Sequence, residues 1–189
     1  MKHIIILGFL LLKTFGNCEL PAYKLNFDFN ESKSDLAIIR DYAEKNKDIP
    51  KNSDLILGTI IEEAEKYDIS PYILYAIFWQ ESRFKAHIEH PFIYVKGKRT
   101  RAVGLGGVVW EWWDKKLIKN DIADVRSDLF DPETNIRASA FILNEFRKMK
   151  QLQGTQNKLE SALARYYGSV KSGYHKKIIK IANKIENQN

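Results

Sequence analysis

The chain has 189 residues, of which 44% are hydrophobic, 12% aromatic and 29% charged. This composition is typical of one globular domain and excludes an intrinsically disordered chain, and a domain of this length buries about 70% of its unfolded surface without disulfides or metals. The single cysteine cannot form an internal disulfide, and the formal charge of +6 favours an acidic partner, whether nucleic acid, anionic lipid or a cell-wall polymer.

The N-terminus has the layout of a secretory signal peptide. A basic start at Lys2 is followed by an apolar run over residues 4–12, which is too short to span a bilayer, and then by small or polar residues up to Cys18. The sequence therefore predicts that residues 1–18 are removed and that the mature protein, without a transmembrane span, acts in the periplasm or is secreted. A buried N-terminal helix or strand is the alternative, and lipoprotein anchoring at Cys18 is a weaker one, because only one small residue precedes it.

The spacing of apolar residues predicts a mainly helical protein. Helices are expected, in chain order, over residues 35–43, 55–67, 72–84, 108–119, 132–152, 158–167 and 174–186. The helix that follows Pro71 is apolar on most faces and should be central. A loop or short hairpin is expected between Ala86 and Val103. We assign residues 19–54 to an N-terminal arm and first helix, and residues 55–189 to the helical domain.

Glu81 is the residue that most suggests chemistry. It shares one stripe of the third predicted helix with Leu74 and Ile77, so its carboxyl should be partly desolvated. Desolvation raises the pKa of a carboxyl, and a glutamic acid that keeps its proton near neutral pH can act as a general acid and then as a general base. The spacing leaves open that Glu81 reaches solvent at the helix end or is neutralised by Arg83 or Arg101.

Other polar and glycine-rich features are less specific. Three glycines within residues 104–107 precede a predicted helix and would let backbone N–H groups approach a ligand. Taken alone, a tight turn is the favoured explanation of them, and no phosphate-binding fingerprint is present. His87 and His90 have no third ligand nearby, so neither a metal site nor a cofactor is predicted.

Four short segments occur in the order that is typical of soluble-type lytic transglycosylases, which are related to goose-type lysozyme. They are Glu81-Ser82, Gly104–Gly107, Asn135–Leu143 and Ala162–Gly168. The chain resembles this SLT-domain family over roughly residues 55–181. The resemblance implies a lysozyme-like helical fold with a short hairpin or loop insertion, with Glu81 as the catalytic acid and Tyr166 as the tyrosine whose hydroxyl bonds that carboxyl.

The resemblance also implies a set of substrate-binding residues: Ser82, Gly104, Leu105, Gly106, Gly107 and Tyr167. The chain departs from the family at two of these places. Gly106 and Gly107 stand where the family usually has Met-Gln, and Tyr167 stands at an asparagine position. Both changes concern the placement of the glycan. The stretch from His87 to Arg101 is longer than the usual connection, which suggests a lid or a partner-binding hairpin.

The reaction that the resemblance implies is a lyase reaction on peptidoglycan. The bond between N-acetylmuramic acid and N-acetylglucosamine is cleaved without water, and the product is a 1,6-anhydro-muramic end; Glu81 serves as acid and then as base. The expected partners are peptidoglycan glycan strands and cell-envelope machinery.

Three alternatives remain beside this reaction. A muramidase would need a second carboxylate, for which Glu89, Glu111 and Asp131 are candidates. A catalytically weak peptidoglycan-binding component of an envelope assembly is suggested by the altered glycine segment. A nucleic-acid binder is disfavoured, because the C-terminal lysines alternate with isoleucines as in an amphipathic helix.

Overall fold

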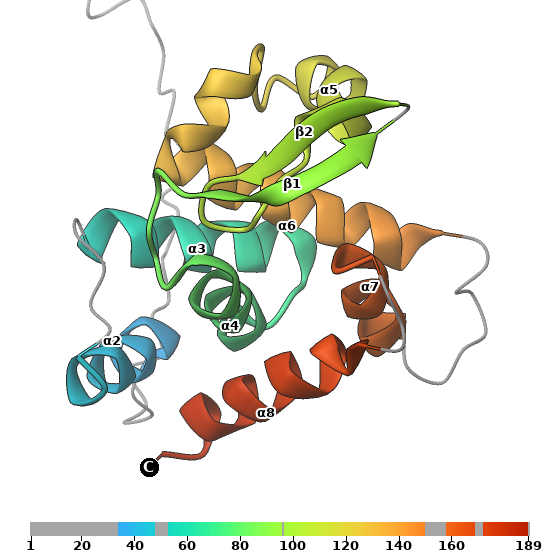
Figure 1. Cartoon of the computed structure of the whole chain (residues 1–189). Coiled ribbons are helices and arrows are strands. Elements are labelled where there is room, and N and C mark those ends of the chain that lie inside the picture. The colour runs from blue at the N-terminus through green and yellow to red at the C-terminus, as the bar shows by residue number, and fades with distance from the viewer. Residues whose placement is uncertain (1–33, 48–52, 96, 150–157, 169–171, 189) are drawn as a thin grey trace, which may run out of the picture. The chain divides into compact units, whose positions relative to one another are not determined.

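The computed structural model describes residues 34–47, 53–95, 97–149, 158–168 and 172–188. The predicted signal peptide with Cys18 lies outside the described residues, as does the last part of the helix predicted to reach residue 152. In chain order the elements are α2 (Asp35–Lys45), α3 (Ser53–Tyr67), α4 (Pro71–Ser82), β1 (Glu89–Val95), β2 (Lys98–Val103), α5 (Trp110–Lys119), the short 3₁₀ helix η1 (Arg126–Phe130), α6 (Pro132–Lys148), α7 (Lys158–Tyr166) and α8 (Tyr174–Glu186) (Figure 1).

The observed elements confirm the mainly helical prediction and the hairpin. Strands β1 and β2 pair antiparallel, with an irregularity between Glu89 and Phe92. Helix α4 ends two residues before the predicted end, because Arg83 and Phe84 have φ values of 53° and 57°. Residues other than glycine rarely adopt this left-handed backbone conformation, and it turns the chain sharply away from the helix axis. No helix within the described ranges is long and apolar enough to cross a bilayer.

Helix α4 is the central element, as its sequence predicts. Its residues Tyr72–Phe78 are all buried, and the helix packs against α2, α3 and α8. Pro71 at the first helical position fixes the backbone for helix initiation. One hydrophobic core forms around α4, and it includes side chains from α2, α3, α7 and α8.

A second core lies under the hairpin, and α6 takes part in both cores. Ile136 and Ala140 of α6 pack into the first core, whereas Ala138 and Phe141 pack into the second with Val103, Trp113, Leu117 and Leu129. This use of both faces explains why every residue of α6 from Asn135 to Asn144 is buried except Arg137. The turn at residues 104–107 follows the hairpin and lies at the junction of the two cores. Its Leu105 belongs to the first core, whereas Val103 and Val108, which flank the turn in the sequence, belong to the second.

Candidate active site

Glu81 lies in the last turn of α4, where the burial of its side chain raises the pKa of its carboxyl. The two arginines that could have neutralised it are engaged elsewhere. The guanidinium carbon of Arg83 lies 3.1 Å from the centroid of the Trp79 ring. Arg101 forms an ion pair with Glu89 at 3.1 Å. Within the described part of the chain, no cation forms an ion pair with Glu81, so the protonated carboxyl is favoured.

The hydroxyl that acts on this carboxyl belongs to Tyr174, the first residue of α8. It is buried and makes no hydrogen bond of ordinary geometry to the described residues, yet it lies close enough to Glu81 to lower the pKa of the carboxyl against the effect of burial. Tyr166 was the tyrosine expected in this role. In the structure its hydroxyl donates to the Gly106 carbonyl at 2.8 Å, and burial together with the charge of Glu81 raises the pKa of Tyr166, so the bond from Tyr166 to the carboxyl stays a prediction.

The glycine turn is held by Asn135 of α6, whose side chain is completely buried. Its amide oxygen accepts a hydrogen bond from the Gly106 N–H at 2.8 Å. Its amide nitrogen donates to the carbonyls of Leu129 at 2.7 Å and Val103 at 3.1 Å. One side chain therefore links the end of the hairpin, the 3₁₀ helix and the turn, and it satisfies backbone groups that would otherwise be buried without partners.

Steric fit explains why glycine occupies two positions of this turn. A Cβ atom on Gly104, where φ is 74°, would lie 2.0 Å from the Asn135 amide nitrogen. A Cβ atom on Gly106 would lie 2.0 Å from the Ser139 hydroxyl oxygen and 2.7 Å from that of Tyr166. A methionine at position 106 would therefore not fit this packing. The hydroxyls of Ser139 on α6 and Tyr166 on α7 thus occupy the space into which a side chain at position 106 would extend.

Gly107 brings the backbone next to Glu81 and to a residue that the sequence analysis set aside. An ideal Cβ on Gly107 would lie 3.2 Å from Glu81 Oε2 and 3.3 Å from His90 Nε2, so these two atoms flank one point. His90 Nε2 is buried and has no hydrogen-bond partner among the described residues. Burial lowers the pKa of His90, against the effect of a hydrogen bond to the Gly104 backbone. Burial therefore favours the neutral imidazole.

The remaining predicted site residues divide into buried and exposed ones. Ser82 is buried, and its hydroxyl donates to the Phe78 carbonyl at 3.0 Å. Leu105 is completely buried in the first core, so both residues support the site from within. Tyr167 is 53% exposed, and its ring stacks on that of Tyr174 with a centroid distance of 4.7 Å. Of the predicted binding residues, Tyr167 offers the most accessible side chain.

The three carboxylates considered as partners for Glu81 make other contacts. Glu89 is paired with Arg126 and Arg101, and these arginines lower the pKa of its carboxyl. Glu111 accepts a hydrogen bond from Thr100 at 2.6 Å, and Asp131 caps α6 by accepting from the Thr134 N–H at 2.8 Å. The described residues also contain no group of three potential metal ligands.

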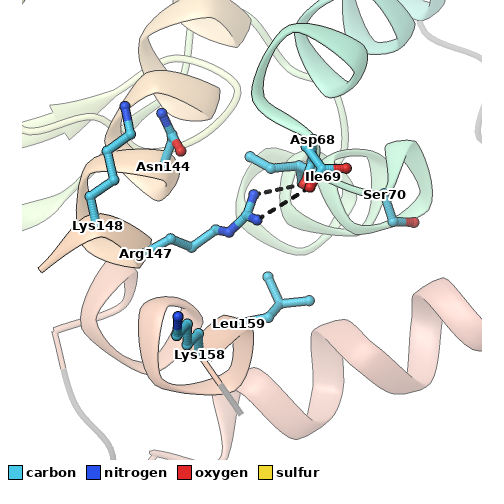
Figure 2. A pocket seen from close by; sticks show the side chains of 8 residues that line it. All are labelled: Asp68, Ile69, Ser70, Asn144, Arg147, Lys148, Lys158 and Leu159. Atoms are coloured by element: carbon cyan, nitrogen blue, oxygen red, sulfur yellow. Dashed lines mark hydrogen bonds and ion pairs between the residues drawn. The ribbon is translucent and has the colours of Figure 1, made fainter. Parts of the chain in front are cut away.

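A cavity of about 480 Å³ lies at the opposite end of α4 (Figure 2). It is lined by Asp68, Ile69, Ser70, Asn144, Arg147, Lys148, Lys158 and Leu159. Ser70 precedes the first residue of α4, whereas Glu81 lies in its last turn, so the length of the helix, about 16 Å, separates them. Arg147 Nη1 is also occupied, because it donates to the carbonyls of Tyr67 and Asp68. This cavity is therefore separate from the surroundings of Glu81.

Tyr174 and His90 are the two site residues that the sequence analysis missed. Tyr174 is far from Glu81 along the chain, and no local spacing connects them; its only signal is its position after Gly173 at the start of a helix. His90 was considered only as a metal ligand.

Comparison with known proteins gives one match. A family model described as the transglycosylase SLT domain matches residues 58–183. Comparisons with curated proteins and with solved structures give no significant match.

Proposed function

The chain belongs to the transglycosylase SLT-domain family, and on this premise we propose that it is a lytic transglycosylase of peptidoglycan. The proposed substrate bond joins N-acetylmuramic acid to N-acetylglucosamine, and the proposed product ends in 1,6-anhydro-muramic acid. Because peptidoglycan lies outside the cytoplasmic membrane, we also propose that the protein acts in the periplasm or is secreted, as its N-terminal sequence predicts.

The observation that carries the proposal is the environment of Glu81. Its carboxyl is largely buried, its pKa is raised by that burial, and the imidazole of His90, which flanks Gly107 together with it, has a lowered pKa. A neutral imidazole does not add the positive charge that would favour ionisation of Glu81. These features suit a carboxyl that must hold a proton when the substrate binds.

In the proposed reaction, Glu81 is the only group that exchanges protons with the glycan. The protonated carboxyl gives its proton to the glycosidic oxygen as the bond from that oxygen to the muramic anomeric carbon breaks. The resulting carboxylate then removes the proton of the muramic 6-hydroxyl, whose oxygen bonds to the anomeric carbon. No water is consumed, and Glu81 ends protonated as it began. Gly107 supports this role because a Cβ atom at this position would lie 3.2 Å from Glu81 Oε2, and its absence keeps a side chain from crowding the carboxyl.

Two structural features favour this proposal over the alternatives. A muramidase of the two-carboxylate type needs a second acid about 5 to 9.5 Å from the first, and the three residues considered for it all contact other groups. An inactive scaffold was suggested by Gly106 and Gly107. The close approach of Ser139 to Gly106 gives the first of these glycines a packing reason, so this glycine does not by itself point to an inactive scaffold.

The experiment that tests the proposal is mass analysis of the soluble products released from purified peptidoglycan. The mature protein should release anhydro-muropeptides, and Glu81→Gln, which keeps the shape of the side chain but cannot give up a proton, should release none. Glu62→Gln is the matched control, because this glutamate is exposed on α3, and it should leave the products unchanged. Reducing-end products would instead indicate a muramidase, and an absence of products with retained binding would indicate a scaffold.

A further inference from the structure

The outer face of the hairpin combines exposed aromatic side chains with arginines. Phe92 pairs with Arg101, and Tyr94 pairs with Arg99 across the two strands, so these four side chains share one face. Phe92 is 46% exposed and Tyr94 is 74% exposed. The opposite face is packed, since Thr100 there bonds to Glu111 of α5.

The positive charge of this face exceeds its negative charge. The guanidinium carbons of Arg99 and Arg101 lie 3.5 and 3.7 Å from the centroid of the Phe92 ring. Arg101 and Arg126 share Glu89 as their acidic partner. Arg99 forms no ion pair with any residue of the described ranges. Three arginines therefore face one carboxylate, and an anionic ligand would reduce the remaining positive charge.

These side chains line an open surface hollow of about 480 Å³. We define the arginine–aromatic surface as Phe92, Arg99, Arg101 and Arg126, which line this hollow together with Glu89 and Thr100. A guanidinium group presents its N–H donors in a planar fork that matches a carboxylate. Stacking on an aromatic ring orients the guanidinium while leaving its N–H edge available. The hollow is therefore suited to a carboxylate attached to a chain that contacts Phe92.

The base of the hairpin lies beside the proposed catalytic residue. Glu89 of the hollow directly precedes His90, whose Nε2 flanks Gly107 together with Glu81 Oε2. An extended peptide of four residues spans up to about 14 Å. A peptide attached to a sugar bound at Glu81 is thus long enough to follow the hairpin from its base.

From this juxtaposition we propose that the arginine–aromatic surface binds a carboxylate of the stem peptide carried by peptidoglycan, so that peptide-bearing glycan is the preferred substrate. The inference rests on the proposed function, since it takes peptidoglycan as the substrate. It adds a substrate class, because stem peptides supply the carboxylates that neutral sugar rings lack.

The test compares two forms of the same glycan: strands that carry stem peptides, and strands from which an amidase has removed them. Arg99→Ala should lower kcat/KM about tenfold on the peptide-bearing strands, as expected for one lost hydrogen bond to a charged group, and leave kcat/KM on the denuded strands unchanged. Lys98→Ala is the matched control, because it removes the neighbouring exposed cation of β2, and it should change neither value. An equal loss on both substrates, or no loss on either, would overturn the proposal.

A binding measurement separates this inference from the proposed function. Glu81→Gln protein is sedimented with peptide-bearing or denuded glycan, and the bound fraction gives Kd without any cleavage. The apparent Kd for peptide-bearing strands should rise about tenfold when Arg99→Ala is added. Equal binding of the single and double variants to those strands would contradict the stem-peptide site, even if the wild-type protein cleaves them. A wild-type protein that cleaves nothing but shows this difference in Kd would refute the proposed reaction alone.

Discussion

The glycine turn and the outer face of the hairpin are adjacent in sequence, but their surroundings differ in kind. Residues 104–106 are buried, and the Gly106 N–H and carbonyl are hydrogen-bonded to Asn135 and Tyr166. The hairpin face has exposed aromatic rings and an arginine, Arg99, without an acidic partner among the described residues.

This difference separates positioning from recognition. Buried polar groups are costly unless they are satisfied, so the turn tolerates few alternative conformations and places Gly107 beside Glu81 reproducibly. Exposed arginines contribute little to the stability of a fold and remain available to a ligand. We therefore expect substitutions in the turn to reduce stability, and substitutions on the hairpin face to change substrate preference.

The largest effect on stability should come from Asn135→Ala. The substitution leaves the Gly106 N–H and the Val103 and Leu129 carbonyls without their partner in a buried region. We expect the free energy of unfolding to fall by about 3 kcal/mol or more, as measured by urea denaturation. Asn183→Ala, on the exposed side of α8, is the control and should change it by less than about 0.5 kcal/mol. A similarly small effect for Asn135 would show that the turn does not depend on this network.

Gly106→Ala tests the close packing of the turn. The new methyl group would overlap the Ser139 hydroxyl, so the free energy of unfolding should fall by about 2 kcal/mol. Combining it with Ser139→Gly should recover part of this loss in a double-mutant cycle. Gly58→Ala is a matched control within α3, because its Cβ meets no atom within 4 Å, and it should stabilise the protein by roughly 0.5 to 1 kcal/mol. Strict additivity of the first two substitutions would contradict the packing explanation.

The raised pKa of Glu81 predicts a stability cost that depends on pH. A carboxyl whose pKa is higher in the folded state binds more protons when folded, so stability falls as pH rises from about 4.5 through the folded-state pKa. Glu81→Gln removes this titration. The variant should match the wild type below pH 4 and exceed it at pH 7, by about 1.4 kcal/mol for each unit by which the pKa is raised. Thermal unfolding at the two pH values measures the difference, and a less stable variant at pH 7 would contradict the account.

The smallest predicted effect is a shift in the pH profile of activity. The Tyr174 hydroxyl lowers the pKa of Glu81, so Tyr174→Phe should raise that pKa. The alkaline limb of kcat/KM, where the free enzyme loses the acidic proton, should therefore move to higher pH. Tyr72→Phe removes a hydroxyl near the other end of α4, where it bonds Asp35, and should leave the limb in place. A downward shift for Tyr174→Phe would show that the hydroxyl favours the protonated carboxyl instead.

The elements of the fold were predictable from the sequence because they depend on local patterns. Pro71 after a serine marks the start of α4, and its apolar residues mark it as central. The 3₁₀ helix at residues 126–130 was not predicted, since a single turn gives no periodic signal and only Leu129 within it is buried. The end of α4 was placed two residues late because the left-handed conformation of Arg83 and Phe84 has no signature in those residue types.

The site was predictable only in part, because it depends on contacts between distant segments. The stripe of apolar residues correctly indicated a largely buried Glu81. Which tyrosine approaches it depends on how α8 packs against α4; the family resemblance implied Tyr166, and Tyr174 was not considered. His90 lies beside Gly107 because of the path of β1, which the sequence pattern does not reveal. The need for glycine at position 106 arises from Ser139 on another helix, so it could not be found from the glycine segment itself.

The most direct test of the central claim is a titration of the Glu81 carboxyl by nuclear magnetic resonance. The side-chain carboxyl carbon of Glu81 is identified as the signal that is lost in the Glu81→Gln variant, and its chemical shift is followed against pH. Burial without an ion pair predicts a midpoint above the ordinary glutamate value of 4.5. A midpoint at or below that value would show that Glu81 is ionised when the substrate arrives, and it would contradict its role as the proton donor.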